Sequence, residues 1–171
     1  MKKRTSASVF LAFCLAAASC GYRPIGTGST LPVSIRRIQV PLFENRTTRF
    51  QLDLKLTRAV IDEFVARGKV EITTDAAKAD AILTGRILSC TATPVAFSNK
   101  TADRYEILVV TEITLKEANT NTVLFTNPSF NYKTDYQVPQ GSDFESSQST
   151  ALDLLAQLYA RSLIVAILEG F

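Results

Sequence analysis

The chain has no histidine and no tryptophan among its 171 residues, and it has only three cysteines. Histidine is the commonest side-chain base at neutral pH and a frequent metal ligand, so its absence removes most metal sites and most Ser-His or Cys-His nucleophiles. The sequence also lacks a Gly-x-Ser-x-Gly elbow, a phosphate-cradling glycine-rich loop and a Cys-x-x-Cys pair. We therefore predict that the chain is not an enzyme, and we assign it no catalytic residue, no metal ligand and no cofactor.

The first twenty residues have the order of a secretory signal. A basic start at residues 2–4 is followed by an uncharged, largely apolar run over residues 7–18, and small residues then lead directly into Cys20. The run is shorter than the roughly 20 apolar residues that a membrane-spanning helix needs. We expect residues 1–19 to be removed as a signal peptide.

Small residues followed directly by cysteine are typical of the lipobox of bacterial lipoproteins, although Ala17 stands where the lipobox usually has leucine. We therefore expect Cys20 to become the first residue and to carry acyl chains that hold the protein at a membrane. Residues 20–32 are rich in Gly, Ser, Thr and Pro, which predicts a flexible tether. The alternative is an ordinary cleaved signal with an incidental cysteine at its end.

Charge changes when the signal is removed. Three of the 19 basic residues and none of the 16 acidic ones lie in it, so the remaining chain has 16 of each. A balanced domain lacks the basic surplus that nucleic-acid binding favours, so we expect no nucleic acid as a partner. Cys90 is left without a second cysteine for a disulfide.

Two segments have the apolar spacing of helices. Leu52, Leu56, Val60 and Phe64 recur every four residues, which predicts a helix over 49–67 that starts at a capping box formed by Thr48 and Gln51 and ends at Gly68. A second capping pattern at Ser142 and Glu145 precedes a longer helix over 143–168. Its last part is apolar on nearly every side, so Leu163, Ile164 and Ile167 are candidates for a surface that faces a partner; the alternative is burial by the chain's own tail and loops.

The remaining apolar patterns are those of strands. They lie at Val33–Val40, at Val70–Thr73, at Ala81–Leu88, at Tyr105–Lys116 and from Val123 onward, where the switch in alternation after Pro128 indicates a bulge. We predict an α+β two-layer sandwich, in which two helices pack on one face of a mainly antiparallel or mixed sheet of about four strands. Residues 33–171 are expected to form this one domain.

Four segments of the mature chain can be compared with known lipoproteins: Cys20–Pro24, Ile38–Thr47, Leu56–Ala59 and Ala79–Ile87. Taken together, they resemble the LptE family of lipopolysaccharide-assembly lipoproteins, and the order and length of the whole mature chain agree with that family. The resemblance implies an outer-membrane lipoprotein, exposed on the periplasmic side, that plugs the lumen of the β-barrel LptD. There it would help the barrel to assemble and help lipopolysaccharide reach the outer leaflet.

Lipopolysaccharide carries phosphates and acyl chains, so a binding surface would combine Lys or Arg with exposed apolar side chains. Phe97, Lys100 and Arg104 lie in a loop expected between Thr93 and Tyr105, where the resemblance places contact with lipopolysaccharide. Lys133 on the neighbouring strand is a further candidate. The alternative is an ordinary solvent-exposed loop, which is where two cations in a loop are usually found.

Two other functions share the same tether and fold class. One is a general envelope lipoprotein that serves as a module for binding another protein. The other is a lipid carrier, which requires an enclosed apolar cavity large enough for acyl chains.

Overall fold

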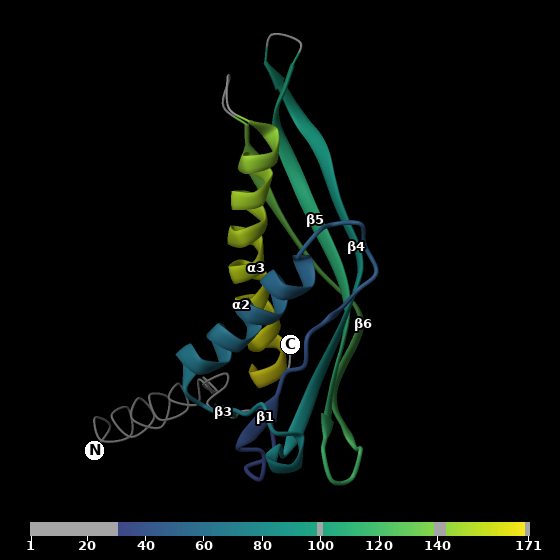
Figure 1. The fold of residues 1–171 in the computed structure, drawn as a ribbon, viewed down its shortest axis with the longest axis vertical. Helices are drawn as coiled ribbons and strands as arrows, with labels where there is room; N and C mark the ends of the chain where they lie inside the picture. Colours follow the sequence, from purple (N-terminus) through teal and green to yellow (C-terminus); the bar gives the residue numbers. More distant parts are fainter. Residues whose placement is uncertain (1–30, 99–100, 139–142, 170–171) are drawn as a thin grey trace, which may run out of the picture.

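The structure, a computed structural model, describes residues 31–98, 101–138 and 143–169. Its centre is three long antiparallel strands, β4 (Ala81–Ser98), β5 (Thr101–Glu117) and β6 (Val123–Gln137). Two helices, α2 and α3, cover one face of this sheet, and neither of them lies on the other face, which we call the helix-free face (Figure 1). The signal peptide, Cys20 and most of the expected tether lie outside the described residues.

Three very short strands complete the sheet, which has six strands rather than the expected four or so. They are β1 (Arg37–Gln39), β2 (Glu44–Asn45) and β3 (Glu71–Ile72). The order is β3-β1-β4-β5-β6, with β1 lying parallel to both β3 and β4, and β2 parallel to β4. The α+β sandwich with a mixed sheet is therefore confirmed, and only the number of strands differs.

The first strand is shorter than its sequence pattern suggests. Only residues 37–39 lie beside β3 and β4, and Val33, at the start of the expected strand, is 90% exposed. The backbone turns before β1, where the Ile35 amide donates to the Pro32 carbonyl at 2.9 Å. The β-branched residues before Arg37 have no neighbouring strand to pair with, so β1 does not extend over them.

Helix α2 (Leu52–Arg67) buries the predicted stripe of Leu52, Leu56, Val60 and Phe64 against the sheet and α3. Gly68 ends it in the left-handed conformation, and its amide donates to the carbonyls of the last turn, as expected of a glycine cap. The start of the helix was predicted wrongly. Gln51 is itself left-handed and makes no side-chain cap, because the preceding chain turns sharply into the helix instead of entering through a capping box.

Helix α3 (Phe144–Glu169) matches the predicted second helix closely. Its start is held by Asp143, whose carboxylate accepts from the Ser146 amide at 2.9 Å; Ser142 of the expected capping box lies outside the described residues. By length and composition α3 could cross a membrane, but 56% of its most apolar window is buried inside the fold. It packs here as the core helix of the sandwich.

The apolar end of α3 lies inside the domain and not on its surface. Leu163, Ile164 and Ile167 are almost completely buried in the chain's own core, which corrects the partner-facing prediction. Helix α2 packs against α3, and the Arg67 guanidinium at the end of α2 lies 3.8 Å from the Glu169 carboxylate at the end of α3. The segment is apolar all round because the sheet covers one side and α2 covers another.

A close contact between β4 and the segment that joins β1 to β2 forms part of the core. The ring of Phe43, in the segment between β1 and β2, lies directly over Gly85 of β4 and is 2% exposed. A Cβ atom at Gly85 would meet that ring at 2.7 Å. Glycine is required there because the ring approaches the backbone itself.

The central hairpins are longer than expected. β4 continues past Thr93 to Ser98, and β5 starts at Thr101 rather than Tyr105, so most of the expected loop is strand. Register shifts on either side of Ala96 accommodate Pro94. The predicted bulge after Pro128 is confirmed, since Thr111 pairs with Phe130 while Ile113 pairs with Asn127.

Candidate functional site

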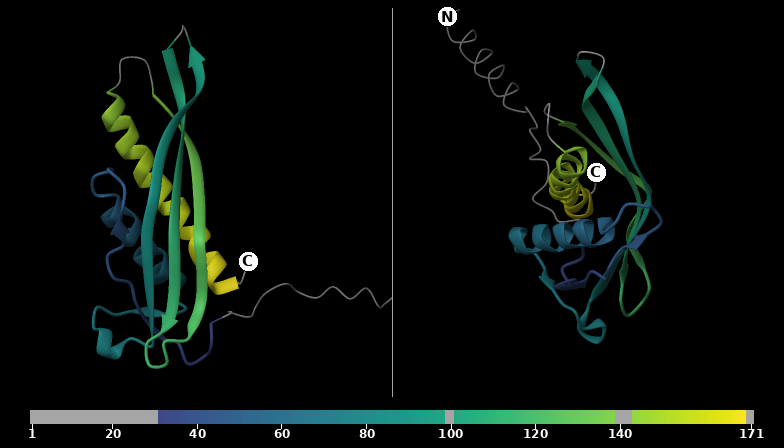
Figure 2. Two further views of the ribbon diagram at one scale, coloured as in Figure 1. Left: turned by 90° about the vertical axis from the view of Figure 1, so that its right-hand side faces the viewer. Right: turned by 45° about the horizontal axis from the view of Figure 1, so that its top comes forward.

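The β4–β5 hairpin forms the far end of the molecule and extends beyond the start of α3 (Figures 1 and 2). The first described residues and β1 lie at the opposite end. β4 has 18 residues, so at about 3.3 Å per residue it runs for roughly 60 Å. The hairpin end is therefore the part of the described chain farthest from the amino-terminal side.

The structure brings Phe97 and Arg104 to this end, on adjacent strands. Phe97 lies opposite Ala102 and is 66% exposed, while Arg104 is exposed and lies between Ala96 of β4 and Gln137 of β6. Among the residues that the structure describes, no carboxylate lies within ion-pair distance of Arg104. Lys100 lies outside the described residues.

Lys133 differs from Arg104 because its charge is already compensated. Its ammonium group donates to the Glu106 carboxylate at 2.8 Å on the helix-free face of the sheet. This hydrogen bond raises the pKa of Lys133, and the neighbouring Asp135 adds a smaller effect in the same direction. An anion approaching this face would meet Lys133 as one half of an ion pair, whereas Arg104 is not paired with any carboxylate in the part of the chain that the structure describes.

An aromatic cluster that the sequence did not reveal ties the hairpin to α3. Tyr105 and Tyr136 stack with ring centroids 5.5 Å apart, and Phe144 meets the edge of Tyr105 at 5.2 Å. The Gln148 amide donates to the Tyr136 hydroxyl at 3.4 Å, and its oxygen accepts from Arg49 at 2.7 Å. Partial burial raises the pKa of Tyr136. The cluster holds the base of the hairpin against the first turns of α3.

Farther from the hairpin end, the helix-free face carries a cluster of charged side chains that are all paired with one another. Arg86 lies 2.8 Å from Glu44 and 2.6 Å from Glu112, and Glu44 also accepts from Arg46 at 2.8 Å. These contacts lower the pKa of Glu44, chiefly through the hydrogen bond from Arg86, and raise the pKa of Arg86. Two cations and two carboxylates already neutralise one another, so this cluster offers little to a charged ligand.

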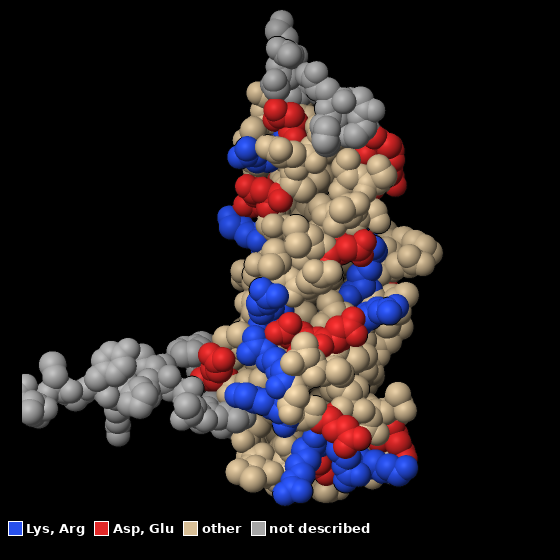
Figure 3. Space-filling model, turned by 90° about the vertical axis from the view of Figure 1, so that its left-hand side faces the viewer, with Lys and Arg blue, Asp and Glu red and all other residues tan. Residues whose placement is uncertain are grey.

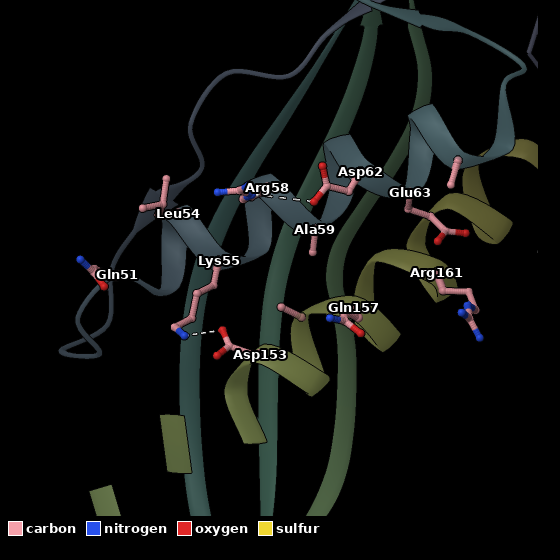
Figure 4. A pocket seen from close by; sticks show the side chains of 12 residues that line it. Gln51, Leu54, Lys55, Arg58, Ala59, Asp62, Glu63, Asp153, Gln157 and Arg161 are labelled. Carbon is pink, nitrogen blue, oxygen red and sulfur yellow. Dashed lines mark hydrogen bonds and ion pairs between the residues drawn. The ribbon is translucent and has the colours of Figure 1, made fainter. Parts of the chain in front are cut away.

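A groove of about 590 Å³ lies between α2 and α3 on the helical face (Figure 4). Lys55 and Asp153 form an ion pair across it, and Arg58 and Asp62 lie 3.9 Å apart on its rim. Acidic and basic side chains alternate over this face (Figure 3). The groove is therefore open and charged, unlike the enclosed apolar cavity that a lipid carrier requires. No cluster of potential metal ligands occurs among the described residues.

The fold and the projecting hairpin define a class of small α+β domains, and solved structures share this fold. One is CT253 from Chlamydia trachomatis, with a TM-score of 0.55 and 11% sequence identity over 80% of this chain and 97% of that chain. Another is PelC from Paraburkholderia phytofirmans, which forms a dodecamer; its TM-score is 0.51 and its identity 14%, over 84% of this chain and 96% of that chain. A third is XCC0632 from Xanthomonas campestris, with a TM-score of 0.51 and 10% identity over 80% of this chain and 88% of that chain. At these identities the likeness concerns the fold alone. No curated protein sequence matches the chain.

Family membership is established by a match over nearly the whole described region. The model of the family described as LptE, lipopolysaccharide-assembly, matches residues 35–167. This range runs from the turn before β1 almost to the end of α3, and so includes the hairpin and both helices. The chain belongs to the LptE family, and the resemblance seen in the sequence is confirmed.

Proposed function

We propose that this chain is an outer-membrane lipoprotein that plugs an LptD-type β-barrel, assists its assembly and helps to pass lipopolysaccharide to the outer leaflet. The observation that carries the proposal is the family match over residues 35–167. The signal and cysteine pattern of residues 1–20 adds the lipid anchor. The domain is a non-enzymatic member of an assembly system, in keeping with the absence of histidine.

The geometry of the two ends supports this arrangement. Cys20 and Leu31 are separated by ten residues, so the eleven steps from one Cα atom to the next reach at most about 40 Å when the chain is fully extended. Leu31 is buried in the core, so the anchor holds the amino-terminal end of the domain near the membrane surface. The hairpin is then free to point away from the anchor, along the axis of the sheet.

The side surfaces suit a polar enclosure. The lumen of an outer-membrane barrel is polar, whereas its lipid-facing side is apolar. The domain presents balanced ion pairs on the helix-free face, around Arg86, and on the helical face, around Lys55. Such surfaces can lie against polar barrel residues without burying an unpaired charge.

Lipopolysaccharide contact is proposed at the hairpin end, through Phe97, Lys100 and Arg104, with Lys133 as a weaker contributor. Phe97 offers an exposed ring to acyl chains. Arg104 offers to phosphate a guanidinium group that forms no ion pair with any carboxylate of the described residues. Lys133 already donates to Glu106, so an anion there would have to compete with a carboxylate.

The test is a pull-down from the native envelope in mild detergent, with mass spectrometry of lipid and protein partners. The wild-type chain should carry acyl chains on Cys20 and recover a large β-barrel protein at about equal stoichiometry. Cys20→Ala should yield an unlipidated chain that separates from the membrane fraction when the barrel is depleted. Recovery of a different stable partner without a barrel would replace the plug function by that of a general interaction module.

A further inference from the structure

The outer edge of β6 is open. Within the described part of the chain, β6 is the last strand of the sheet and pairs only with β5. From Phe130 to Gln137 the pairing with β5 is continuous and free of bulges. An uninterrupted edge of this length is a template for another strand.

The backbone groups that point outward along this edge can be identified. The Val138 amide donates to the Asp103 carbonyl of β5, at 2.9 Å, so the polar groups of residue 138 face inward. Because antiparallel strands alternate, the even-numbered residues from 130 to 138 face β5 and the odd-numbered ones face outward. The amides and carbonyls of Asn131, Lys133, Asp135 and Gln137 are therefore the ones directed at the open edge.

The residues of this edge are arranged symmetrically about Thr134. The residues next to Thr134 on its two sides are a cation and an anion, Lys133 and Asp135. The next two are both tyrosines, Tyr132 and Tyr136, and the two after them both have side-chain amides, Asn131 and Gln137. We propose that two copies of this chain pair antiparallel through β6, with Thr134 on the two-fold axis. Each Lys133 then lies opposite Asp135 of the other copy.

The hydrogen-bonding phase agrees with this register. Lys133 and Asp135 both direct their backbone groups outward, so they form the hydrogen-bonded pairs on each side of the axis. Thr134 directs its backbone groups inward and meets its own copy as a non-hydrogen-bonded pair. A shift by one residue would place inward-facing groups opposite outward-facing ones, whereas a shift by two would keep the phase but place Lys133 or Asp135 opposite its own copy. The register about Thr134 satisfies both backbone phase and charge.

Charge gives a further reason for a second copy. Within one chain Asp135 lies directly opposite Glu106, and Lys133, which hydrogen-bonds to Glu106, is shared electrostatically between the two carboxylates. Like charges on directly opposite residues destabilise a sheet. The second copy brings another Lys133 directly opposite Asp135, and the reverse contact forms at the same time.

The faces of β6 are compatible with this pairing. α3 contacts the inner side chains of the strand, since Phe130 packs on Tyr159 and Tyr136 bonds to Gln148. Lys133 and Asp135 lie on the helix-free face and are exposed. An interface of one short strand pair is small, so the association is weak and depends on concentration. The inference does not rest on the proposed function, because its readout is mass in solution.

The decisive experiment uses two complementary charge variants of the lipidated chain in detergent, compared by sedimentation and native mass spectrometry. Lys133→Asp places acids opposite acids, and Asp135→Lys places cations opposite cations, so each alone should lose the dimer that the wild type forms at high concentration. An equal mixture of the two should restore it as a heterodimer, because every acid then faces a cation. A monomeric wild type at all concentrations, or a mixture that stays monomeric, would overturn the proposal.

A cysteine placed on the axis provides an independent check of the register. In a Cys90→Ser background, Thr134→Cys should form an intermolecular disulfide under mild oxidation, since Cα atoms of a non-hydrogen-bonded pair lie about 4.5 Å apart. Thr126→Cys, on the same strand beyond the bulge, is the control and should crosslink at least tenfold less. Equal crosslinking at positions 126 and 134 would contradict antiparallel pairing about Thr134.

Discussion

The two ends of the molecule are built in opposite ways. At the end that carries β1, β3 and α2, apolar side chains from the sheet and both helices close over one another, and Phe64 and Phe43 are almost completely buried. At the other end the β4–β5 hairpin extends beyond the start of α3, and a phenylalanine of the same size, Phe97, is 66% exposed. The same residue type thus serves the core at one end and the surface at the other.

This difference separates stability from recognition. A packed end resists changes of shape, whereas a hairpin held at its base by Tyr105, Tyr136 and Phe144 can present side chains without being needed for the core. We therefore expect substitutions at the packed end to change the free energy of unfolding. Substitutions at the hairpin end should change binding instead.

The largest difference in the free energy of unfolding is expected between alanine substitutions of two phenylalanines, one at each end. Phe64→Ala should lower the free energy of unfolding by about 3–5 kcal/mol, because it opens a cavity in the core. Phe97→Ala should change it by no more than about 0.5 kcal/mol. Urea denaturation of the two variants measures both values, and comparable losses would show that the hairpin end is part of the cooperative core.

A second prediction concerns the contact between Gly85 and Phe43. Gly85→Ala should destabilise the fold by about 1–3 kcal/mol, because the added methyl group would lie 2.7 Å from the ring. Phe43→Leu in the same chain should recover part of the loss by removing the flat ring. If the double variant is no more stable than Gly85→Ala in denaturant titrations, the ring is not the cause.

A third prediction concerns the hairpin itself. Arg104→Glu should weaken binding of purified lipopolysaccharide roughly tenfold, since one charge-assisted contact is replaced by repulsion. Lys116→Glu is the matched control, because Lys116 is exposed on the same strand near its other end. Circular dichroism should show both variants folded, and equal binding by both would remove Arg104 from the proposed site.

The smallest effect is expected at Asp80, beside β1. Its carboxylate accepts from the amides of Arg37 and Arg36, at 2.8 and 3.1 Å, and these bonds lower its pKa. Its contribution to stability is therefore complete above its usual pKa of about 3.9 and is lost as pH falls through the lower pKa of the folded state. Asp80→Asn should flatten the acid limb of the stability curve. Parallel curves for the variant and the wild type would contradict this.

The sequence predicted the parts of the fold that repeat a pattern. Burial on one face selects apolar residues at a fixed interval, so α2 and α3 each leave a periodic signal in the sequence. The bulge after Pro128 is visible as a break in the alternation of a strand. The two-residue strand β2 is too short to leave a period and was not predicted. The strands predicted at Val33–Val40 and Val70–Thr73 exist as β1 and β3, but they pair over only three and two residues, because the paired length depends on which segments the fold brings side by side.

The errors at the site have physical reasons as well. From Thr93 to Phe97 no residue of β4 is fully buried, so no alternation of buried and exposed positions indicates a strand there. The cluster of Tyr105, Tyr136 and Phe144 joins three distant segments, which local patterns cannot reveal. Leu163 and its neighbours were assigned to a partner because their segment is apolar all round; it is instead enclosed between α2 and the sheet.

The central claim is that the hairpin end, away from the anchored end, contacts lipopolysaccharide. It is tested most directly by placing a photoreactive amino acid at Phe97 or at Val33, two exposed apolar positions at opposite ends of the domain, and irradiating living cells. The account predicts that lipopolysaccharide is captured by the probe at position 97 and not by the probe at position 33. Capture at position 33 alone, or at neither position in a functional chain, would contradict it.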